Sequence, residues 1–388
     1  MEKYICPRCG NSNPKYIGYI NNKPYCRFCI SLKGESAPPN IHHGGAVVLD
    51  LKYSLSKEQK EISDRVIDNF KNHIDTLINA ICGAGKTELV YGVMAYALTN
   101  NMSVGFAVPR RDVVIELFSR IKSAFPSNKV VAVYGGSTSR LSADIVVLTT
   151  HQLFRYENYF DLLILDEIDA FPYKGNLLLY TMFKKAVRGN SVLMSATPSE
   201  DVLKEYRKPN REILELNVRF HRHKLPVPKI KIGYGIFKYI LLINICRNFI
   251  HKKKPFLVFT PTIEKCEEVY HRISILLPNG NYVHSKAENR SEIIEGFKRG
   301  KYQYLVTTAV LERGVTIKDL QVVIFEANNS IYDEASLVQI SGRVGRKFDA
   351  PDGEVIYVAE KTTFAMEKSI QTIRNKNKSL QGLLQSDK

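Results

Sequence analysis

No stretch of this 388-residue sequence approaches the ~18 consecutive apolar residues that a membrane-spanning helix requires. The longest apolar candidate, residues 239–246, is short and is followed directly by Arg247. The first residues, Met1–Tyr4, lack the apolar core of a secretory signal peptide. We therefore expect a cytoplasmic protein without a transmembrane segment.

Acidic residues are scarce relative to basic ones, since 39 Asp and Glu stand against 55 Lys and Arg, a formal net charge of +16. Binding of a basic protein to a polyanion releases counterions, which favours a nucleic-acid partner. The same charge also fits a basic but unspecialised surface. With 44% hydrophobic and 24% charged residues, the composition is that of a globular protein and argues against global disorder or a fibre.

Cysteine is rare outside the first thirty residues, where four of the seven cysteines lie. They form two Cys-x-x-Cys pairs, which are Cys6 with Cys9 and Cys26 with Cys29. The odd total fits a reducing compartment better than a disulfide framework. Two tight turns of this kind can complete the four-sulfur shell that Zn²⁺ accepts, so we expect a structural zinc site. Two disulfides or a redox pair are the alternatives.

The segment around these cysteines is too short to bury a core of its own, so a bound metal would supply folding energy. Basic and aromatic side chains alternate between the two pairs, at Lys15, Tyr16, Tyr19, Lys23 and Tyr25. They fit either a surface that grips phosphates and stacks bases or the small core of a zinc ribbon. Residues 34–40 are typical of a linker, so residues 1–50 form a zinc module and linker in this interpretation.

From about residue 52 onward, strand-length apolar runs alternate with helical stretches, which predicts an α/β fold with a parallel sheet. In the first half the runs cover residues 76–81, 103–108, 130–134, 145–149, 162–165 and 191–194. Helical patterns in this half cover residues 86–99 and 112–125. The second half repeats the rhythm with strands at 256–259, 304–306, 322–325 and 354–358, and helices at 236–251, 263–276, 290–298 and 333–341. We place a hinge at residues 213–228.

A phosphate loop follows the first of these strands. It comprises the residues Ala80, Ile81, Cys82, Gly83, Ala84, Gly85, Lys86 and Thr87. Its glycines let backbone amides face phosphates, and the next helix contributes its positive N-terminal end. We expect Lys86 to reach the β- and γ-phosphates of ATP and the Thr87 hydroxyl to ligate Mg²⁺.

Two further positions fit a nucleotide site. Gln59 lies one short helix before the loop, and a glutamine amide can pair with both N6 and N7 of adenine. An ordinary exposed glutamine is the alternative. The buried run at 162–165 ends in Asp166 and Glu167. We expect Asp166 to hold Mg²⁺ through water and Glu167 to orient and deprotonate the attacking water.

Three runs in order along the chain resemble the motifs of superfamily 2 helicases and translocases: Asp166–Asp169, Ser195–Thr197 and Gln339–Arg346. The resemblance implies two RecA-like lobes, at residues 51–215 and 216–388. It also implies ATP and Mg²⁺ as cofactors, a nucleotide role for Gln339, and a nucleic-acid track. Strand-end residues expected to touch the nucleic-acid backbone are Arg110, Thr150, Thr260 and Thr307.

Arg343 and Arg346 lie three residues apart after a helix-length segment, so we expect them on one helical face. They would act as arginine fingers that meet the γ-phosphate from the second lobe, with surface basic residues as the alternative. Closure of the lobes would then depend on the γ-phosphate, and hydrolysis would advance a nucleic-acid strand. Many relatives carry an acid where this chain has Thr316, in the run Leu311–Thr316.

A four-cysteine module followed by such a motor resembles the late competence protein ComFA family, and the runs Asp166–Tyr173 and Leu311–Thr316 strengthen the match. The resemblance implies an ATPase stimulated by single-stranded DNA that acts at the inner face of the membrane during uptake of transforming DNA, with ComFC-like and DprA-like partners. The alternatives are a replication-restart helicase or another superfamily 2 nucleic-acid-dependent ATPase, and a zinc adaptor that uses ATP only as a switch.

Overall fold

The computed structural model describes residues 4–30, 32, 34–39, 46–51, 53–169, 173, 175–311 and 317–386. The chain divides into two compact units, Met1–Ala80 with Gly85–Leu216 and Ile81–Ala84 with Asn217–Lys388. We call them the first and second units. Residues 170–172 and 312–316, which carry parts of two family motifs, lie outside the described residues.

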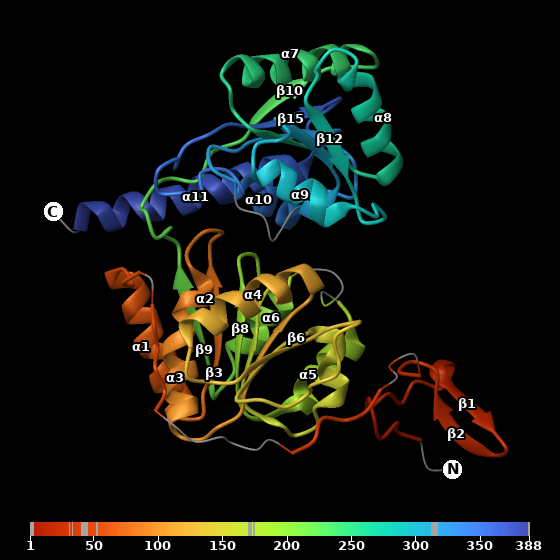
Figure 1. The fold of residues 1–388 in the computed structure, drawn as a ribbon, viewed down its shortest axis with the longest axis vertical. Coiled ribbons are helices and arrows are strands. Elements are labelled where there is room, and N and C mark those ends of the chain that lie inside the picture. The colour runs from red at the N-terminus through yellow and green to blue at the C-terminus, as the bar shows by residue number, and fades with distance from the viewer. Residues whose placement is uncertain are drawn as a thin grey trace. The chain divides into compact units, whose positions relative to one another are not determined.

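The first unit begins with a small hairpin (Figure 1). The short turn η1 (Pro14–Tyr16) leads into β1 (Ile17–Ile20), which pairs antiparallel with β2 (Lys23–Cys26). Asn21 and Asn22 connect the two strands with φ of 48° and 57°. Two successive left-handed residues match the twist of a two-residue hairpin, and asparagine tolerates this conformation better than most side chains.

A seven-stranded parallel sheet forms the body of the first unit, in the order β5-β6-β4-β7-β8-β3-β9. Its strands are β3 (Asp75–Ala80), β4 (Val104–Val108), β5 (Val130–Val133), β6 (Ile145–Thr149), β7 (Phe160–Leu165), β8 (Val187–Ser195) and β9 (Arg211–Leu216). Its helices are α1 (Lys57–Lys71), α2 (Lys86–Leu89), α3 (Tyr91–Thr99), α4 (Arg111–Ala124), η2 (Thr150–Arg155), α5 (Leu177–Ala186) and α6 (Glu200–Tyr206). The parallel sheet expected from the alternating pattern is confirmed.

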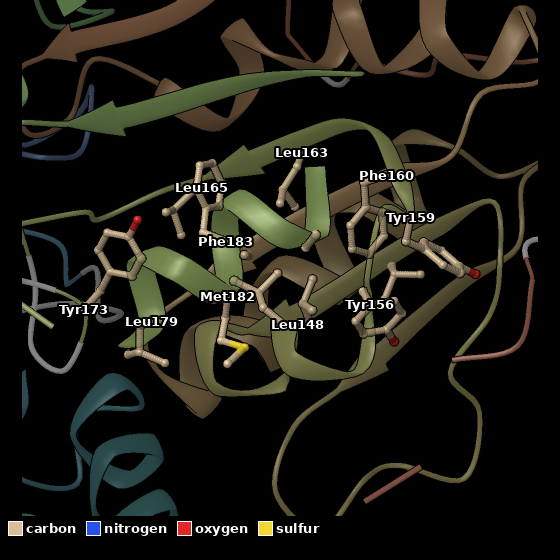
Figure 2. Close-up of a cluster of buried hydrophobic side chains, with 14 of the residues drawn as sticks. Leu148, Tyr156, Tyr159, Phe160, Leu163, Leu165, Tyr173, Leu179, Met182 and Phe183 are labelled. Atoms are coloured by element: carbon tan, nitrogen blue, oxygen red, sulfur yellow. The ribbon is translucent and has the colours of Figure 1, made fainter. Parts of the chain in front are cut away.

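One face of this sheet carries a core rich in aromatic side chains, in which β7, η2 and α5 meet (Figure 2). Phe160 and Leu163 of β7 pack with Phe183 of α5 and with Tyr156 after η2. The buried Tyr156 hydroxyl donates to the Leu141 carbonyl at 2.9 Å, so its polar end is satisfied. This packing holds β7 in place, and β7 carries the two acids at its end.

A second parallel sheet, in the order β10-β15-β14-β11-β13-β12, forms the second unit. Its strands are β10 (Lys229–Ile232), β11 (Phe256–Phe259), β12 (Gly280–Val283), β13 (Tyr304–Thr307), β14 (Gln321–Phe325) and β15 (Val355–Ala359). Its helices are α7 (Phe237–His251), α8 (Ile263–Ser274), α9 (Arg290–Lys298), η3 (Ala309–Leu311), α10 (Glu334–Ser341) and α11 (Phe364–Ser386). Side chains of α7 and α8 form one buried cluster with the sheet, and those of α9, α10 and α11 form another.

The structure differs from the sequence pattern in three places. The stretch 86–99 is broken at Val90 into α2 and α3, and the first part of the expected hinge, residues 213–216, belongs to strand β9. The pattern also missed the short strands β10 and β12, both at edges of the second sheet. Edge strands are half exposed, so their hydrophobic signal is weak. Within the described residues, no helix has the length and apolarity to cross a membrane.

Candidate functional site

The four N-terminal cysteines converge on one point. All four Sγ atoms lie within 4.8 Å of one another, and all four residues are buried. Cys6 and Cys29 are 3.7 Å apart at sulfur, and Cys9 and Cys26 are 3.6 Å apart. Tetrahedral zinc with Zn–S bonds of about 2.3 Å requires sulfurs ~3.8 Å apart, whereas a disulfide requires about 2.05 Å. The cluster therefore fits a metal ion and not two disulfides.

Hydrogen-bond donors around Cys26 favour its thiolate form. Burial raises the pKa of the Cys9 and Cys29 thiols. At Cys26 burial acts in the same direction, but backbone N–H groups of Phe28 and Cys29 and the Asn11 amide donate to the sulfur and lower the pKa of that thiol. The Asn11 Nδ2–Sγ distance is 3.5 Å. A metal needs deprotonated thiols, so these donors support ligation.

The cysteine module is packed against the parallel sheet and helices of the first unit, to which it belongs. Its cysteines belong to the same buried cluster as Met182 and Phe183 of α5. The Lys185 amine donates to the Pro7 carbonyl. On the module's surface, Tyr16 and Tyr19 are 42% and 67% exposed, so they are not the core of a zinc ribbon.

Arg155, at the end of η2, holds the segment that follows the module. Its Nη1 donates to the Glu35 carbonyl at 2.6 Å, and its own carbonyl accepts from the Ala37 amide at 2.8 Å. A Cβ at Gly34, where φ is +141°, would lie 2.2 Å from Arg155 Nη2. Residues 34–39 therefore follow the surface of the first unit instead of forming a free tether.

The phosphate loop lies where the sequence predicts it, between β3 and α2. Gly83 and Gly85 have φ of +84° and +76°, a conformation in which glycine avoids the strain that a Cβ would cause. Gly85 is the N-cap of α2, which begins with Lys86. Lys86 Nζ lies 3.5 Å from the Ala80 carbonyl, and Thr87 is 9% exposed. The loop thus presents a helix N-terminus with its lysine folded back over it.

Gln59 borders this loop, because a Cβ at Gly85 would lie 2.5 Å from Gln59 Nε2. Its Oε1 accepts from the Ser56 amide at 2.9 Å, and the Ser56 hydroxyl accepts from the Gln59 amide in return. This capping box begins α1 and fixes the side chain beside the loop. The sequence alone did not show that the side-chain carbonyl of Gln59 also caps the start of helix α1.

The two acids of β7 end at the same edge of the sheet as the phosphate loop. Strand β8 alone separates β3 from β7, so their carboxyl ends lie ~10 Å apart at the usual strand spacing. Asp166 Oδ1 accepts from the Glu167 amide at 2.8 Å. Glu167 has φ of +60°, a left-handed conformation that strains a side chain and is common at functional sites.

The third acid of this run is bound to the end of β8. Asp169 Oδ1 accepts from the Ser195 hydroxyl at 2.9 Å, and Oδ2 accepts from the Thr197 hydroxyl at 2.8 Å. The runs Asp166–Asp169 and Ser195–Thr197 are therefore physically joined at the centre of the sheet edge.

In the second unit, the two arginines are not on a helical face, contrary to the expectation from their spacing. Helix α10 ends at Ser341, and Gly345 has φ of +68°, so Arg343 lies in the turn after the helix and Arg346 directly follows that turn. Arg343 is buried, and Arg346 Nε donates to the Gly342 carbonyl at 3.0 Å. Gln339 is buried within α10.

Comparisons with known proteins agree with this arrangement of elements. Residues 52–200 match the family described as type III restriction enzyme, res subunit, and residues 238–348 match the helicase conserved C-terminal domain. Competence protein ComFA of Bacillus subtilis (strain 168) is 33% identical, covering 97% of this chain and 86% of that protein. ComFA of Streptococcus pneumoniae (strain ATCC BAA-255 / R6) is 32% identical, covering 97% and 91%.

The chain belongs to the ComFA family. Solved structures with the same fold include S. cerevisiae Dbp5 bound to RNA and ADP BeF3, with a TM-score of 0.60, 18% identity and coverage of 84% of this chain and 92% of that one. DEAD-box helicase Mss116 bound to ssRNA and UDP-BeF aligns with a TM-score of 0.64 at 16% identity, over 82% and 77%. Both sheets are thus RecA-like. As a ComFA-family member with both helicase domains, the chain is a superfamily 2 ATPase, an ATP-dependent helicase or translocase.

Three threonines expected to touch nucleic acid are buried in this ComFA-family chain. Thr307 Oγ1 donates to the Val283 carbonyl at 2.8 Å, and Thr260 Oγ1 lies 3.2 Å from the Thr307 carbonyl. Thr150 is also buried, at the start of η2. In the described conformation the hydroxyls of Thr260 and Thr307 bond carbonyls at the ends of neighbouring strands, and their contact with nucleic acid stays a prediction. Arg110 is partly exposed at the N-terminus of α4.

Sequence reasoning named Arg219 only as part of a hinge and missed its contacts in the second unit. Its guanidinium donates to three carbonyls of the turn that carries Arg343, those of Gly342, Val344 and Gly345. The helicase motifs offered no signal for this residue, because it lies more than a hundred positions from the turn. The only hint in the sequence was that Arg219 is a basic residue with apolar neighbours on both sides, within the segment expected to be a hinge.

Proposed function

We propose that this chain is an ATP-driven translocase on single-stranded DNA that takes part in the uptake of transforming DNA. The observation that carries the proposal is the near-full-length similarity to ComFA, at 33% identity over 97% of the chain. The exposed Tyr16 and Tyr19 and the net charge of +16 support a polyanion with stackable bases. The Streptococcus and Bacillus relatives are named competence proteins, which supports the role in uptake.

In this proposal ATP binds with its phosphates on the loop Ala80–Thr87 and its adenine at Gln59. Lys86 neutralises charge on the β- and γ-phosphates, while Thr87 and Asp166 would hold Mg²⁺, which offsets the charge that develops at the transferred group. Glu167 orients the attacking water and accepts its proton. Glu167 has a left-handed backbone, and its amide donates a hydrogen bond to the Asp166 carboxylate. Both features support a fixed orientation of the Glu167 carboxylate.

We further propose that Arg343 and Arg346, with Gln339 before them, complete the site when ATP is bound. Their guanidiniums would stabilise negative charge on the γ-phosphoryl oxygens during hydrolysis. Loss of the γ-phosphate would remove their partner, which couples ATP state to movement along the strand. Arg110 is the strand-end residue best placed for a phosphate of the track, because it alone of the expected contacts is not buried.

The metal in Cys6, Cys9, Cys26 and Cys29 would be zinc, held for structure. The sulfur separations of 3.6 and 3.7 Å support this ion. Docking of the module on α5 and η2 supports a role in shaping the first unit rather than in the reaction. ComFC-like and DprA-like proteins, and a DNA channel at the inner face of the membrane, are the partners that the proposed uptake role requires.

Steady-state ATP hydrolysis with and without single-stranded DNA, single-stranded RNA and duplex DNA tests the proposal. We expect stimulation by single-stranded DNA above the other two. Stimulation by RNA alone would exclude the uptake role. Glu167→Gln should bind ATP normally but hydrolyse it at least ~100-fold more slowly, since it loses the base and keeps the shape. An exposed carboxylate change, Glu288→Gln, serves as the matched control.

A further inference from the structure

The turn after α10 is a backbone structure that needs outside support. Residues 342–345 follow the last residue of the helix, where main-chain carbonyls have no partner within the helix. Gly345 takes φ of +68°, and a Cβ there would lie 2.0 Å from the Pro351 carbonyl. Arg343 is within this turn and Arg346 directly follows it. The direction of both side chains therefore depends on what holds these carbonyls.

Arg219 supplies that support from the segment after β9. Its Nη1 donates to the Gly345 carbonyl at 2.7 Å and to the Val344 carbonyl at 3.0 Å, and its Nη2 donates to the Gly342 carbonyl at 3.2 Å. The side chain is 1% exposed. A planar guanidinium presents several N–H groups in a fixed geometry, so it can bridge three carbonyls that a lysine amine cannot span.

The contact is unusual because a buried guanidinium normally faces a carboxylate. Within the described residues, no acidic side chain lies in ion-pair distance of Arg219, and the only groups that its Nη atoms contact in the second unit are these carbonyls. These three carbonyls lie at the C-terminal end of α10, where the negative end of the helix dipole attracts a cation. Burial and the nearby Arg346 lower the pKa of Arg219 to about 10, so it stays charged near neutral pH.

Arg219 and Arg346 share one acceptor. Arg346 Nε donates to the Gly342 carbonyl at 3.0 Å, and Arg219 Nη2 donates to the same oxygen. His221 adds a further bond, from Nε2 to the Gly345 carbonyl at 2.9 Å. The base of the Arg346 guanidinium is thus oriented by a carbonyl that Arg219 holds in place.

We propose that Arg219 is a positioning residue for ATP hydrolysis, which sets the turn Gly342–Gly345 so that Arg343 and Arg346 point at the γ-phosphate. The inference rests on the proposed function, in which these two arginines stabilise the transition state. Arg219 itself contacts backbone carbonyls and takes no part in the chemical step. The Nε of Arg219 also donates to the Cys82 carbonyl of the phosphate loop at 3.2 Å. Its loss should therefore lower kcat more strongly than it raises KM for ATP, because three of its four bonds hold the turn of Arg343 and one reaches the loop.

The experiment compares Arg219→Ala, Arg219→Lys and the exposed control Lys224→Ala in the full chain, with saturating single-stranded DNA. For Arg219→Ala we expect kcat to fall by up to ~100-fold, the loss associated with about 1 Å of misplacement, and KM for ATP to change by a much smaller factor than kcat. Guanidinium chloride at concentrations too low to unfold the protein should restore part of the kcat of Arg219→Ala. It should not raise that of Lys224→Ala.

A folded Arg219→Ala variant with the kcat of the unchanged protein would overturn the inference. So would a variant whose kcat falls only in proportion to its folded fraction, measured by circular dichroism, and does not respond to guanidinium. If Arg219→Ala does not fold, Arg219→Lys decides. A normal kcat in Arg219→Lys overturns the inference, and a kcat that falls by a larger factor than KM rises supports it.

Arg343→Lys and Arg346→Lys, assayed in parallel, separate this inference from the function on which it rests. Normal kcat in both would refute the arginine roles themselves. A large loss in both, together with normal kcat in Arg219→Ala, would refute only the positioning role of Arg219.

Discussion

The guanidinium of Arg8, in the cysteine module, lies over the ring of Phe154 in η2, with 4.8 Å between Cζ and the ring centroid. Arg155 lies at the same distance from that ring. Arg8 also donates to the Cys29 carbonyl at 3.4 Å, so one side chain links the four-cysteine cluster to helix η2. The module is thereby joined to the helical turn that begins with Thr150.

Replacing Phe154 with leucine should loosen this attachment while leaving the metal cluster intact. A partly exposed cation–π contact stabilises by ~0.5–1 kcal/mol, so a double-mutant cycle of Arg8→Ala and Phe154→Leu should give a coupling energy in that range. Amide hydrogen exchange across residues 17–26 should become faster in Phe154→Leu. Phe118→Leu, which removes the Lys122 contact on α4, is the control and should not change exchange in the hairpin.

Removal of the metal should unfold the module. Because a segment of this size buries little core, metal binding supplies its folding energy, and Cys9→Ser should lose both the ion and hydrogen-exchange protection of β1 and β2. Elemental analysis should find about one zinc per chain in the unchanged protein and far less in Cys9→Ser. Cys246→Ala, at a buried thiol of α7, should keep its full zinc content. Full zinc content in Cys9→Ser would contradict the assignment.

The hydroxyl of Thr197 should stabilise the edge of the first sheet through Asp169. A hydrogen bond to a charged acceptor is worth about 1.5–3 kcal/mol, so Thr197→Val should lower the free energy of unfolding by that order. Urea denaturation measures the change. Thr99→Val removes an exposed hydroxyl that bonds only the Ala95 carbonyl, and it should cost much less. If both variants lowered the free energy of unfolding by the same amount, the Thr197 hydrogen bond to Asp169 would contribute no additional stability.

Stability should fall on the acid side because of His221. Its Nδ1 accepts from the His223 amide and its Nε2 lies on the Gly345 carbonyl, an arrangement that requires the neutral ring. Burial, the charge of Arg219 and the nearby His223 lower the pKa of His221 below 6.5. The folded state thus binds this proton less readily than the unfolded state. The stabilisation is present above pH 6.5 and is lost as the pH falls through the lowered value.

Unfolding free energies at about pH 7.5 and about pH 5.5 test this dependence, since histidine changes charge in that range. The unchanged protein should lose more stability on acidification than His221→Gln, which cannot be protonated. His251→Gln, at the exposed end of α7, should behave like the unchanged protein. An identical acid loss in His221→Gln would remove His221 as the cause.

Much of the fold was predictable because strong local signals carry it. The phosphate loop after β3 and the acids after β7 follow apolar runs that are mostly buried strands, and such runs have few alternative structures. The parallel order of the sheets follows from the alternation of strands and helices. Edge strands β10 and β12 escaped prediction because half of each faces solvent, and the hinge was placed too early because β9 is an edge strand as well.

The candidate site was only partly predictable. Spacing suggested that Arg343 and Arg346 share a helical face. Helix α10 ends before both arginines, and Gly345 between them has a left-handed backbone that a regular helix does not contain. The strand-end positions of Thr260 and Thr307 suggested contacts with phosphates, whereas both hydroxyls lie on backbone carbonyls of the sheet. A spacing rule assumes a regular element, and it fails where the chain turns.

The sequence by itself determined the two Cys-x-x-Cys pairs, the phosphate loop and the acidic strand end, because each is a short run whose chemistry depends on neighbours a few residues away. Only the tertiary structure decided that Arg219 holds the turn of Arg343, that Asp169 binds the end of β8, and that the cysteine module rests on η2. Each of these contacts joins residues far apart in the chain. Folding brings them together through burial of the sheets and helices between them, and no local pattern records which distant side chain will meet which carbonyl.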